Sequence, residues 1–345
     1  MKYKNSNILL FIPGGENGFY AGAIKKVLES SGCQVVICPE RPSNKTMSKI
    51  LLRLGRKVIP SYFASYIRRI VAENKNKSFD YVLIVRGEGF SPLAMKILKD
   101  AYPTACFILY AWDLIATTDV RWILKYFDRI ISFDYQDALR NNMIFRPLFF
   151  LPQYETLKKE DNILYQLYMV GTITSQQRYQ LMKSLELYMN KCGKKYSFYY
   201  YIPSLPSYWL AKCKGIIPFF SSKKEYHFSP LSHKEQMKLL SQSVAIVDVP
   251  HPLQVYSLNM RPFEAMAAQV KLLTTSKCIS KYNFYNEENI FVMSDDQKIE
   301  IPSNFWDSAY IPVPESIMNM YSIKNWVVDI FDLEKNESYT KFFKS

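Results

Sequence analysis

The segment of residues 244–275 brings an arginine and a carboxylate to the start of a helix. An apolar strand that ends at Asp248 is followed by a polar loop, by a helix that opens with Arg261 and Pro262, and by a second apolar strand. Proline suits a first helical turn, because no N–H is needed there. The free N–H groups of that turn attract anions. We therefore expect Arg261 to contact a phosphate and Glu264 to accept hydrogen bonds from a ribose. The alternative is a surface arginine and a glutamate that only complements the helix dipole.

Four segments carry a resemblance to a known family. They are the R-x-x-E-A-x-A motif with the Thr-Thr strand that follows it, and residues 169–178, 245–261 and 271–292. Together they resemble the C-terminal nucleotide-sugar site of GT-B glycosyltransferases, most of all the bacterial polysaccharide and lipopolysaccharide-core transferases related to the CgeB-like group. The resemblance covers most of residues 165–333, whereas the N-terminal half shares mainly the layout. Gln269 departs from the glycine that usually ends this helix.

The resemblance implies that the second half of the chain binds a nucleotide-diphosphate sugar. The turn at Gly171 and Thr172 follows an expected strand at 166–170 and matches a family loop that lies against the diphosphate. Arg178, on the next helix, would complete the positive charge. It could equally be a surface residue of that helix.

Three residues of the polar loop before the Arg261 helix are further candidates for the donor site. His251 would contact the donor phosphate, unless it is an ordinary loop histidine. Gln254 and Asn259 would hydrogen-bond the donor sugar or base. Retaining members of the family carry two glutamates eight positions apart, but Tyr256 stands at the first of these positions here. The resemblance therefore favours an inverting mechanism.

An inverting transferase needs a general base for the acceptor hydroxyl. All three histidines lie in the second half of the chain, so a base in the first half must be a carboxylate. The carboxylates near the expected carboxyl ends of strands are Glu16, Glu88, Asp113 and Asp119. We predict Asp113 and Glu16 as the catalytic candidates. Each of them could instead be a helix cap or an ion-pair partner.

Six of the eleven glycines follow two expected strands, at positions 14, 15, 18, 22, 87 and 89. Glycine lets the backbone approach a ligand closely, so we predict Gly14, Gly15 and Glu88 as an acceptor-side loop; tight turns alone are the alternative. Residues 85–92 begin like a dinucleotide fingerprint. Pro92 replaces its third glycine, which argues against NAD or FAD. We expect no cofactor other than the nucleotide-sugar substrate.

Apolar strands alternate with helical segments along the whole chain, which is typical of parallel sheets covered on both faces. A chain of 345 residues suits two domains. We expect an α/β, GT-B fold of two Rossmann-like parallel-sheet domains that face a cleft, with a C-terminal helix crossing back to the first domain. Its parts are an acceptor-side domain (1–150), a linker (151–163), a nucleotide-sugar domain (164–320), and a crossing helix with a loose tail (321–345). Within them we also expect a helix near Thr117 and a strand near Ile216.

The formal charge of +13 is concentrated between residues 41 and 77, where ten Lys and Arg accompany one acidic residue, Glu73. Interleaved apolar residues predict basic amphipathic helix broken near Pro60. Its basic face is expected to contain Arg53, Arg56, Lys57, Arg68 and Arg69. Such a face suits an anionic glycolipid or glycan acceptor and the surface of the inner membrane. A solvated helix face is the alternative. Nucleic acid is disfavoured, because no nucleic-acid module accompanies the basic residues.

Other chemistries lack their sequence signatures. The six cysteines show no C-x-x-C spacing, so zinc and disulfide frameworks are not expected and a reducing cytoplasm fits. There is no D-x-D after an apolar strand, no G-x-S-x-G, no Walker loop and no H-E-x-x-H, so no metal is expected. No apolar run reaches the roughly 20 residues of a membrane span. The first residues predict a buried strand rather than a signal peptide.

These observations predict a cytoplasmic, metal-independent glycosyltransferase, peripheral on the inner membrane. It would transfer a hexosyl or deoxyhexosyl group to a bacterial surface glycan, such as lipopolysaccharide core or capsule. Two alternatives stay open at this point. One is a sugar-nucleotide epimerase or hydrolase on the same frame, which fold alone does not exclude. The other is a non-catalytic partner in polysaccharide assembly.

Overall fold

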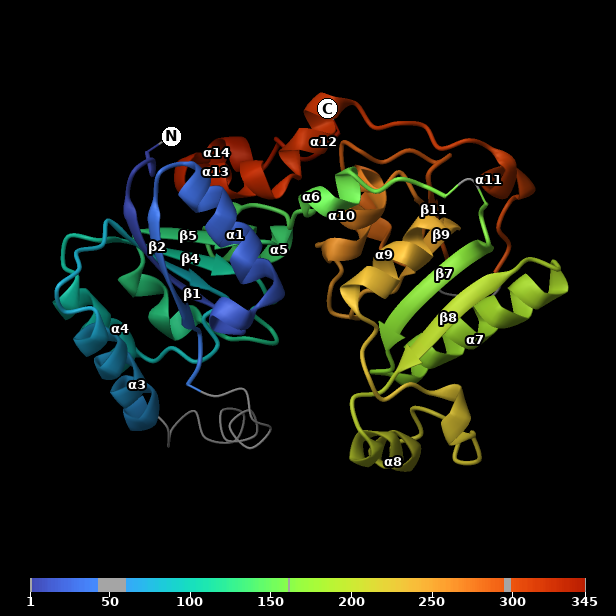
Figure 1. Ribbon diagram of the computed structural model, residues 1–345, viewed down its shortest axis with the longest axis horizontal. Helices are drawn as coiled ribbons and strands as arrows, with labels where there is room; N and C mark the ends of the chain where they lie inside the picture. The colour runs from blue at the N-terminus through green and yellow to red at the C-terminus, as the bar shows by residue number, and fades with distance from the viewer. Residues whose placement is uncertain (1, 43–59, 161, 295–298, 345) are drawn as a thin grey trace. The chain divides into compact units, whose positions relative to one another are not determined.

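The computed structural model describes residues 2–42, 60–160, 162–294 and 299–344 (Figure 1). The chain forms two compact units. The first consists of Met1–Phe149 together with Asn319–Ser345, and the second of Phe150–Met318. Each unit is described by itself below.

The first unit is built on a six-stranded parallel sheet of order β2-β1-β3-β4-β5-β6. Its elements are β1 (Asn7–Ile12), η1 (Gly15–Asn17), α1 (Phe19–Ser30), β2 (Gln34–Pro39), α3 (Pro60–Glu73), β3 (Tyr81–Val85), α4 (Pro92–Ala101), β4 (Cys106–Ala111), η2 (Arg121–Tyr126), β5 (Arg129–Ser132), α5 (Tyr135–Arg140), β6 (Ile144–Phe145), α13 (Ile323–Asp332) and α14 (Lys335–Ser338). Helix α12 (Glu315–Met320) spans the boundary between the units.

The second unit is built on a five-stranded parallel sheet of order β11-β10-β9-β7-β8. Its elements are α6 (Pro152–Glu155), β7 (Tyr165–Thr172), α7 (Gln176–Lys191), β8 (Tyr196–Tyr201), α8 (Leu205–Cys213), η3 (Lys223–Glu225), α9 (His233–Ser241), β9 (Ser243–Asp248), α10 (Met260–Ala267), β10 (Lys271–Thr274), η4 (Lys277–Lys281), β11 (Ile290–Val292) and α11 (Ser303–Asp307). The prediction of two parallel α/β domains is confirmed.

Continuous apolar strands form the first sheet because both of its faces are covered. Residues 8–12 of β1 are all buried. Leu9 lies opposite Val36 of β2 and Val82 of β3. Helix α1 packs against α13, and α3 packs against α4. Each leucine or isoleucine buried in this way contributes about 1.5–3 kcal/mol relative to an exposed one.

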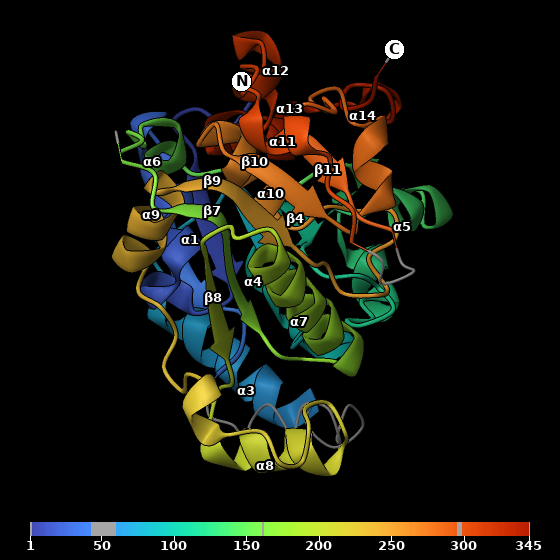
Figure 2. The ribbon, with the colours of Figure 1, turned by 90° about the vertical axis from the view of Figure 1, so that its right-hand side faces the viewer.

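The second sheet separates two helical layers. Leu167 and Met169 of β7 share a core with Met182 and Leu185 of α7, and Figure 2 shows α7 lying across β7 and β8. Alternate strand residues point to opposite faces, so Tyr168 faces the other layer. Helices α9 and α10 contact β9 in that layer.

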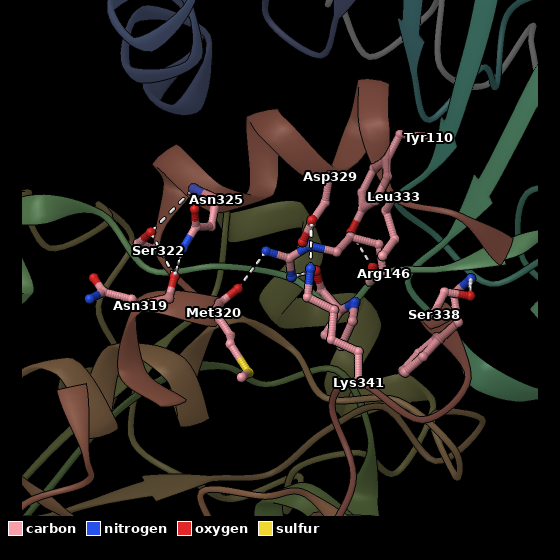
Figure 3. Close-up of polar contacts among 12 residues, drawn as sticks. Tyr110, Arg146, Asn319, Met320, Ser322, Asn325, Asp329, Leu333, Ser338 and Lys341 are labelled. Carbon is pink, nitrogen blue, oxygen red and sulfur yellow. Dashed lines mark hydrogen bonds and ion pairs between the residues drawn. The ribbon is translucent and has the colours of Figure 1, made fainter. Parts of the chain in front are cut away.

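A buried ion pair fastens the C-terminal helices to the first sheet (Figure 3). Arg146, which follows β6, is fully buried, and its Nε lies 2.8 Å from Oδ2 of Asp329 on α13. Lys341 Nζ lies 2.8 Å from the other carboxylate oxygen. The Arg146 guanidinium also donates to the carbonyl of Met320 at 2.7 Å. Burial lowers the pKa of Arg146, and the Asp329 carboxylate opposes that shift.

Replacing Asp329 with Asn is expected to destabilise the first unit by about 3–5 kcal/mol, because it leaves the buried Arg146 charge without its counter-charge. Thermal melting followed by circular dichroism measures the effect. Lys341→Met is the matched control. It keeps the Arg146–Asp329 pair, so its melting temperature should fall much less. Equal losses in the two variants would show that the buried pair is not the main source of stability.

The C-terminal tail is ordered, so the prediction of a loose tail is wrong. Tyr339 donates from its hydroxyl to the carbonyl of Met143 at 2.5 Å, and Phe342 is completely buried. Phe343 stacks on Phe145 of β6 with ring centroids 5.5 Å apart. The aromatic side chains of the tail thus bury the edge of the first sheet. The helical segments of the tail are too short to show a periodic pattern of apolar residues, so the sequence alone did not predict this packing.

Two further local predictions are wrong. The chain forms only a turn at Thr117, whose N–H donates to Leu114, and the 3₁₀ helix η2 begins at Arg121 instead. The Asp119 carboxylate starts η2 by accepting from the Arg121 N–H at 3.1 Å. Near Ile216 there is no strand among the described residues, since the Ile216 N–H donates to Ala211 and closes α8. The apolar residues there fill the core without joining the sheet.

Candidate functional site

Arg178 lies across the backbone of Gly171 at the carboxyl end of β7. A Cβ atom at Gly171 would stand 2.7 Å from the Arg178 Nη2, so any larger residue there would require the guanidinium to shift. Ser175 caps α7 by accepting from the Arg178 N–H at 3.2 Å. The side chain donates to the carbonyl of Val249 at 3.0 Å. Burial lowers the pKa of Arg178 to about 10, with a smaller contribution from the charge of Arg261 and opposition from Asp248.

Asp248, the last residue of β9, anchors the site and was not singled out for a role by the sequence. It is 1% exposed. Asn259 donates its Nδ2 to the carboxylate at 2.7 Å and Thr274 donates its hydroxyl at 3.2 Å. Burial raises the pKa of Asp248, while Arg261 and the two hydrogen bonds oppose the shift. The sequence signal that could have identified Asp248 is its position directly after an apolar strand.

The structure brings Arg261 and Glu264 together in a largely desolvated group. Asn259 caps α10 by accepting from the Arg261 N–H at 2.9 Å, and the Arg261 guanidinium donates to Val247 at 3.0 Å. Burial raises the pKa of Glu264, opposed first by Arg261 and then by a hydrogen bond from Tyr154. Both side chains keep part of their surface exposed. The group holds the start of α10 against β9 and α6.

A cavity of about 500 Å³ opens at the carboxyl edge of the second sheet. Its walls come from the start of α7 and from the loops after β9 and β10, and they include Thr174, Ser175, Gln177, Arg178, Leu181, Val249, Pro250, His251, Pro252, Gln254, Val255, Thr275, Ser276, Lys277 and Ser294. This is the edge at which open parallel sheets bind ligands. The volume is typical of small-molecule sites.

The predicted donor residues divide between the cavity and its support. Arg178, His251 and Gln254 are in the cavity wall, whereas Gly171, Thr172, Asn259, Arg261 and Glu264 are outside that wall. His251 accepts from the Leu253 N–H through its Nδ1 at 3.2 Å. Its carbonyl also accepts from the Gln254 N–H at 2.8 Å. These two hydrogen bonds lie within the exposed loop and hold the side chains of His251 and Gln254 at the rim of the cavity.

In the first unit, ions cluster where β2, β3 and β4 end. Arg86 Nη2 lies 2.5 Å from Glu40 Oε1, and the same guanidinium pairs with Glu88 and lies 3.7 Å from Asp113 Oδ2. Arg41 Nη1 lies 3.2 Å from Glu88 Oε2. Arg86 has a φ of 75°, a left-handed conformation that costs a non-glycine residue energy. The strand ends thus place three carboxylates around one arginine.

Asp113, one of the two predicted bases, is a member of this cluster. Its side chain is 40% exposed, and Thr118 donates its hydroxyl to Oδ2 at 3.4 Å. Burial raises the pKa of Asp113, and Arg86 opposes the shift. The other candidate, Glu16, is exposed in η1. Of the two, Asp113 has the environment expected of a tuned acid or base.

The backbone conformation of the loop after β1 requires glycine at two positions. Gly14 has a φ of 83° and Gly15 a φ of 57°. A Cβ atom on Gly15 would stand 2.6 Å from Cγ of Pro39. Turn geometry and close packing account for both glycines, and their contact with an acceptor stays a prediction.

Glu40 was not predicted from the sequence, although it is fully buried in the cluster. Burial raises its pKa to about 7, and Arg86 and Arg41 oppose this shift. Since the folded state keeps a proton that the unfolded state has lost above the ordinary glutamate pKa, stability should fall as pH rises through this window.

We therefore expect Glu40→Gln to flatten the pH dependence of stability. The neutral amide cannot ionise, so the fall in melting temperature between pH 5 and pH 8 should be smaller than in the wild type. Thermal melts at both pH values measure it. The exposed Glu16→Gln is the control, and its pH dependence should match that of the wild type. A wild-type slope in Glu40→Gln would show that Glu40 does not titrate in this range.

The predicted basic face is described only in part. Arg53, Arg56 and Lys57 lie outside the described residues, whereas Arg68 and Arg69 are exposed on α3. Arg69 lies 3.7 Å from Glu73 in an exposed i,i+4 pair. On the opposite side of α3, apolar residues such as Phe63, Ile67 and Ile70 are buried. The described part of this segment, α3, is amphipathic, and the predicted break near Pro60 adjoins residues outside the described ranges.

No family model matches the chain, and no curated protein matches it either. Among the described residues, no group of three or more His, Cys, Asp or Glu is placed to hold a metal ion. The helices that the structure describes are all too short or too polar to cross a bilayer.

Solved structures are similar to the chain over nearly its whole length. An α-glucosyltransferase crystallised with UDP and a 13-mer DNA containing an A:G mismatch is 16% identical, with 98% of this chain and 94% of that chain covered and a TM-score of 0.54. A glycosyltransferase from Rickettsia africae is 11% identical, with coverages of 97% and 96% and a TM-score of 0.54. Anabaena HepE, in complex with UDP and glucose, is 10% identical, with coverages of 97% and 92% and a TM-score of 0.52. With its two parallel sheets, the chain has the fold of the GT-B glycosyltransferases.

Proposed function

We propose that the chain is a metal-independent glycosyltransferase that moves a hexosyl or deoxyhexosyl group from a nucleotide-diphosphate donor to a bacterial surface glycan. The observation that carries the proposal is the cavity at the carboxyl edge of the second sheet, with the desolvated Arg178 in its wall. A half-buried cation beside a helix start favours a diphosphate over a neutral ligand. Lipopolysaccharide core and capsule are the acceptor classes. The enzyme would work in the cytoplasm, peripheral on the inner membrane.

Within this proposal the donor nucleotide is uridine-based. The α-glucosyltransferase and HepE were both crystallised with UDP, and both share the fold. Arg178 would contact the diphosphate, with Lys277, His251 and Gln254 around it. Arg261 would add positive potential from behind the cavity wall. The predicted ribose contact of Glu264 stays a prediction, since its carboxylate is engaged with Tyr154.

Acceptor activation is assigned to the first unit. Asp113 would take the proton of the acceptor hydroxyl as general base, and a single displacement would invert the anomeric centre. Burial raises the pKa of Asp113, which makes it a stronger base than an exposed aspartate. Arg86 would position this carboxylate through their 3.7 Å contact.

A thermal-shift screen with UDP-, GDP-, dTDP- and CMP-sugars tests the donor site. A ligand that binds the folded state raises the melting temperature, by an amount that grows with its concentration relative to Kd. We expect UDP-sugars to stabilise the chain and free sugars to have no effect. Stabilisation by none of the four classes would contradict the proposed function. Product analysis of the donor after incubation without acceptor would reveal an epimerase or hydrolase instead.

A further inference from the structure

Exposed apolar side chains gather on α8 and on the loop that follows it. Phe220 is 96% exposed, Phe219 61%, Trp209 57% and Leu210 53%. Lysines stand among them, and the whole group is called here the aromatic–lysine surface: Leu205, Trp209, Leu210, Lys212, Lys214, Phe219, Phe220, Lys223 and Lys224. In Figure 1, α8 and this loop form one end of the second unit, beyond β8. A contiguous exposed patch of this kind marks an interaction surface.

The fold itself holds these side chains outward. Tyr208, which is 3% exposed, points into the core of the second unit. Its hydroxyl and the Lys212 ammonium both donate to the carbonyl of Ser221, at 2.9 and 3.0 Å. Lys212 Nζ also lies 5.2 Å from the centre of the Trp209 ring and 5.8 Å from that of Phe219. The loop is thus pinned to α8 from the inside, and its aromatic residues are left on the outside.

The charge on this surface is positive. Residues 203–230 contain four lysines, and Glu225 is their one acidic residue. The Glu225 carboxylate is already engaged, because it accepts from the Ser222 N–H at 3.0 Å and lies 3.5 Å from Lys183. Lys214, Lys223 and Lys224 therefore present a net positive field beside the apolar side chains. That combination complements a surface that is both anionic and partly apolar.

An anionic bilayer fits this chemistry better than the other partners. Tryptophan and phenylalanine reside at the level of lipid headgroups, and lysines are attracted to anionic lipids. Protein interfaces, in contrast, are depleted in lysine. Single-stranded nucleic acid stacks its bases on aromatic rings, and the aliphatic Leu205 and Leu210 have no part in such stacking.

We propose that the aromatic–lysine surface binds the surface of an anionic phospholipid bilayer. Trp209, Leu210, Phe219 and Phe220 insert at the boundary between headgroups and acyl chains, while the exposed lysines contact lipid phosphates. This places a membrane contact in the second unit, apart from the basic face of α3 in the first. It extends the membrane contact of the proposed function, but none of its residues lines the nucleotide cavity.

Co-sedimentation of the full chain with vesicles tests the proposal. We expect binding to vesicles of equal parts phosphatidylcholine and phosphatidylglycerol, and weaker binding to phosphatidylcholine alone. The double variant Phe219→Ser/Phe220→Ser should bind at least about tenfold more weakly, since two large side chains no longer leave water. Lys223→Gln and Lys224→Gln should each cost about fivefold.

Matched controls distinguish binding through this surface from non-specific binding to vesicles. Leu187 on α7 is 71% exposed and lies outside the patch, so Leu187→Ser should bind vesicles as the wild type does. The double variant Lys191→Gln/Lys195→Gln removes two exposed lysines elsewhere and should lose less than Lys223→Gln/Lys224→Gln. Unchanged melting temperatures would show that every variant is folded.

Insertion of the aromatic side chains into the bilayer can be measured separately from vesicle binding. Lipids with brominated acyl chains should quench the tryptophan fluorescence of the bound chain, and Trp209→Phe should remove most of that quenching. Wild-type vesicle binding by the double phenylalanine variant, or quenching that persists in Trp209→Phe, would overturn the proposal. So would a dimer that only the phenylalanine variant dissociates, or equally tight binding to a single-stranded oligonucleotide. Thermal stabilisation by UDP-sugars, measured on the same variants, fails only if the proposed function fails.

Discussion

Asp113→Asn is expected to lower kcat for sugar transfer by about 10²–10⁴-fold, the usual contribution of a positioned general base. The amide keeps the size and the contact with Thr118 but cannot take a proton. In the wild type, kcat should also decline as pH falls through the raised pKa of Asp113, because the protonated carboxyl is no longer a base. Release of nucleoside diphosphate from the donor, with lipopolysaccharide-core oligosaccharide as acceptor, measures the rate.

Two observations make this result specific. Donor binding, followed by thermal shift, should be unchanged in Asp113→Asn, since the cavity proposed to bind the donor is built by the second unit. Glu16→Gln, the second candidate base, should keep most of the wild-type rate. The assignment is wrong if Glu16→Gln is inactive while Asp113→Asn turns over normally.

Arg178→Ala is expected to raise the Kd of the nucleotide-sugar donor by roughly 30-fold, because removing a half-buried charge partner of an anion costs about 2 kcal/mol. Gly171→Ala should act in the same direction, since its Cβ would displace the Arg178 guanidinium. Titration by thermal shift or calorimetry gives the constants.

Lys191→Ala is the matched control for Arg178→Ala. It removes one positive charge from the exposed end of the same helix, so it should leave the Kd within about twofold, because exposed charges are screened. Arg178→Lys should lie between the wild type and Arg178→Ala, because it keeps a charge but loses the planar fork. Donor affinity that survives in Arg178→Ala would move the diphosphate to another part of the cavity.

Local signals predicted much of the fold. The strand at 81–85 is an uninterrupted run of apolar residues, which is typical of a buried parallel strand. Ser91 caps α4 ahead of Pro92, as the Ser-Pro pair predicts. Gln269, where the family usually has glycine, adopts the left-handed conformation that a glycine would, with a φ of 52°. These features depend on residues close together in sequence, and that is why the sequence reveals them.

The site was less predictable, because it depends on residues far apart in sequence. Arg178 and Gly171 were expected near the diphosphate, but their contact arises only when α7 folds back on β7. Asp248 gained its role from Asn259 and Thr274, which arrive from a loop and a neighbouring strand. The pairing of Glu40 with Arg86 joins the ends of two strands. No spacing rule brings such residues together.

The discontinuity of the first unit has a consequence for synthesis on the ribosome. Its sheet is translated early, but the helix that neutralises Arg146 is encoded near the other end of the chain. During translation, the first half of the chain therefore lacks α13, which packs against α1 in the folded unit. This continues while the second unit is synthesised and folds. Chaperones have a long interval in which to meet this half-finished domain, and slowing translation within codons 150–318 would prolong it.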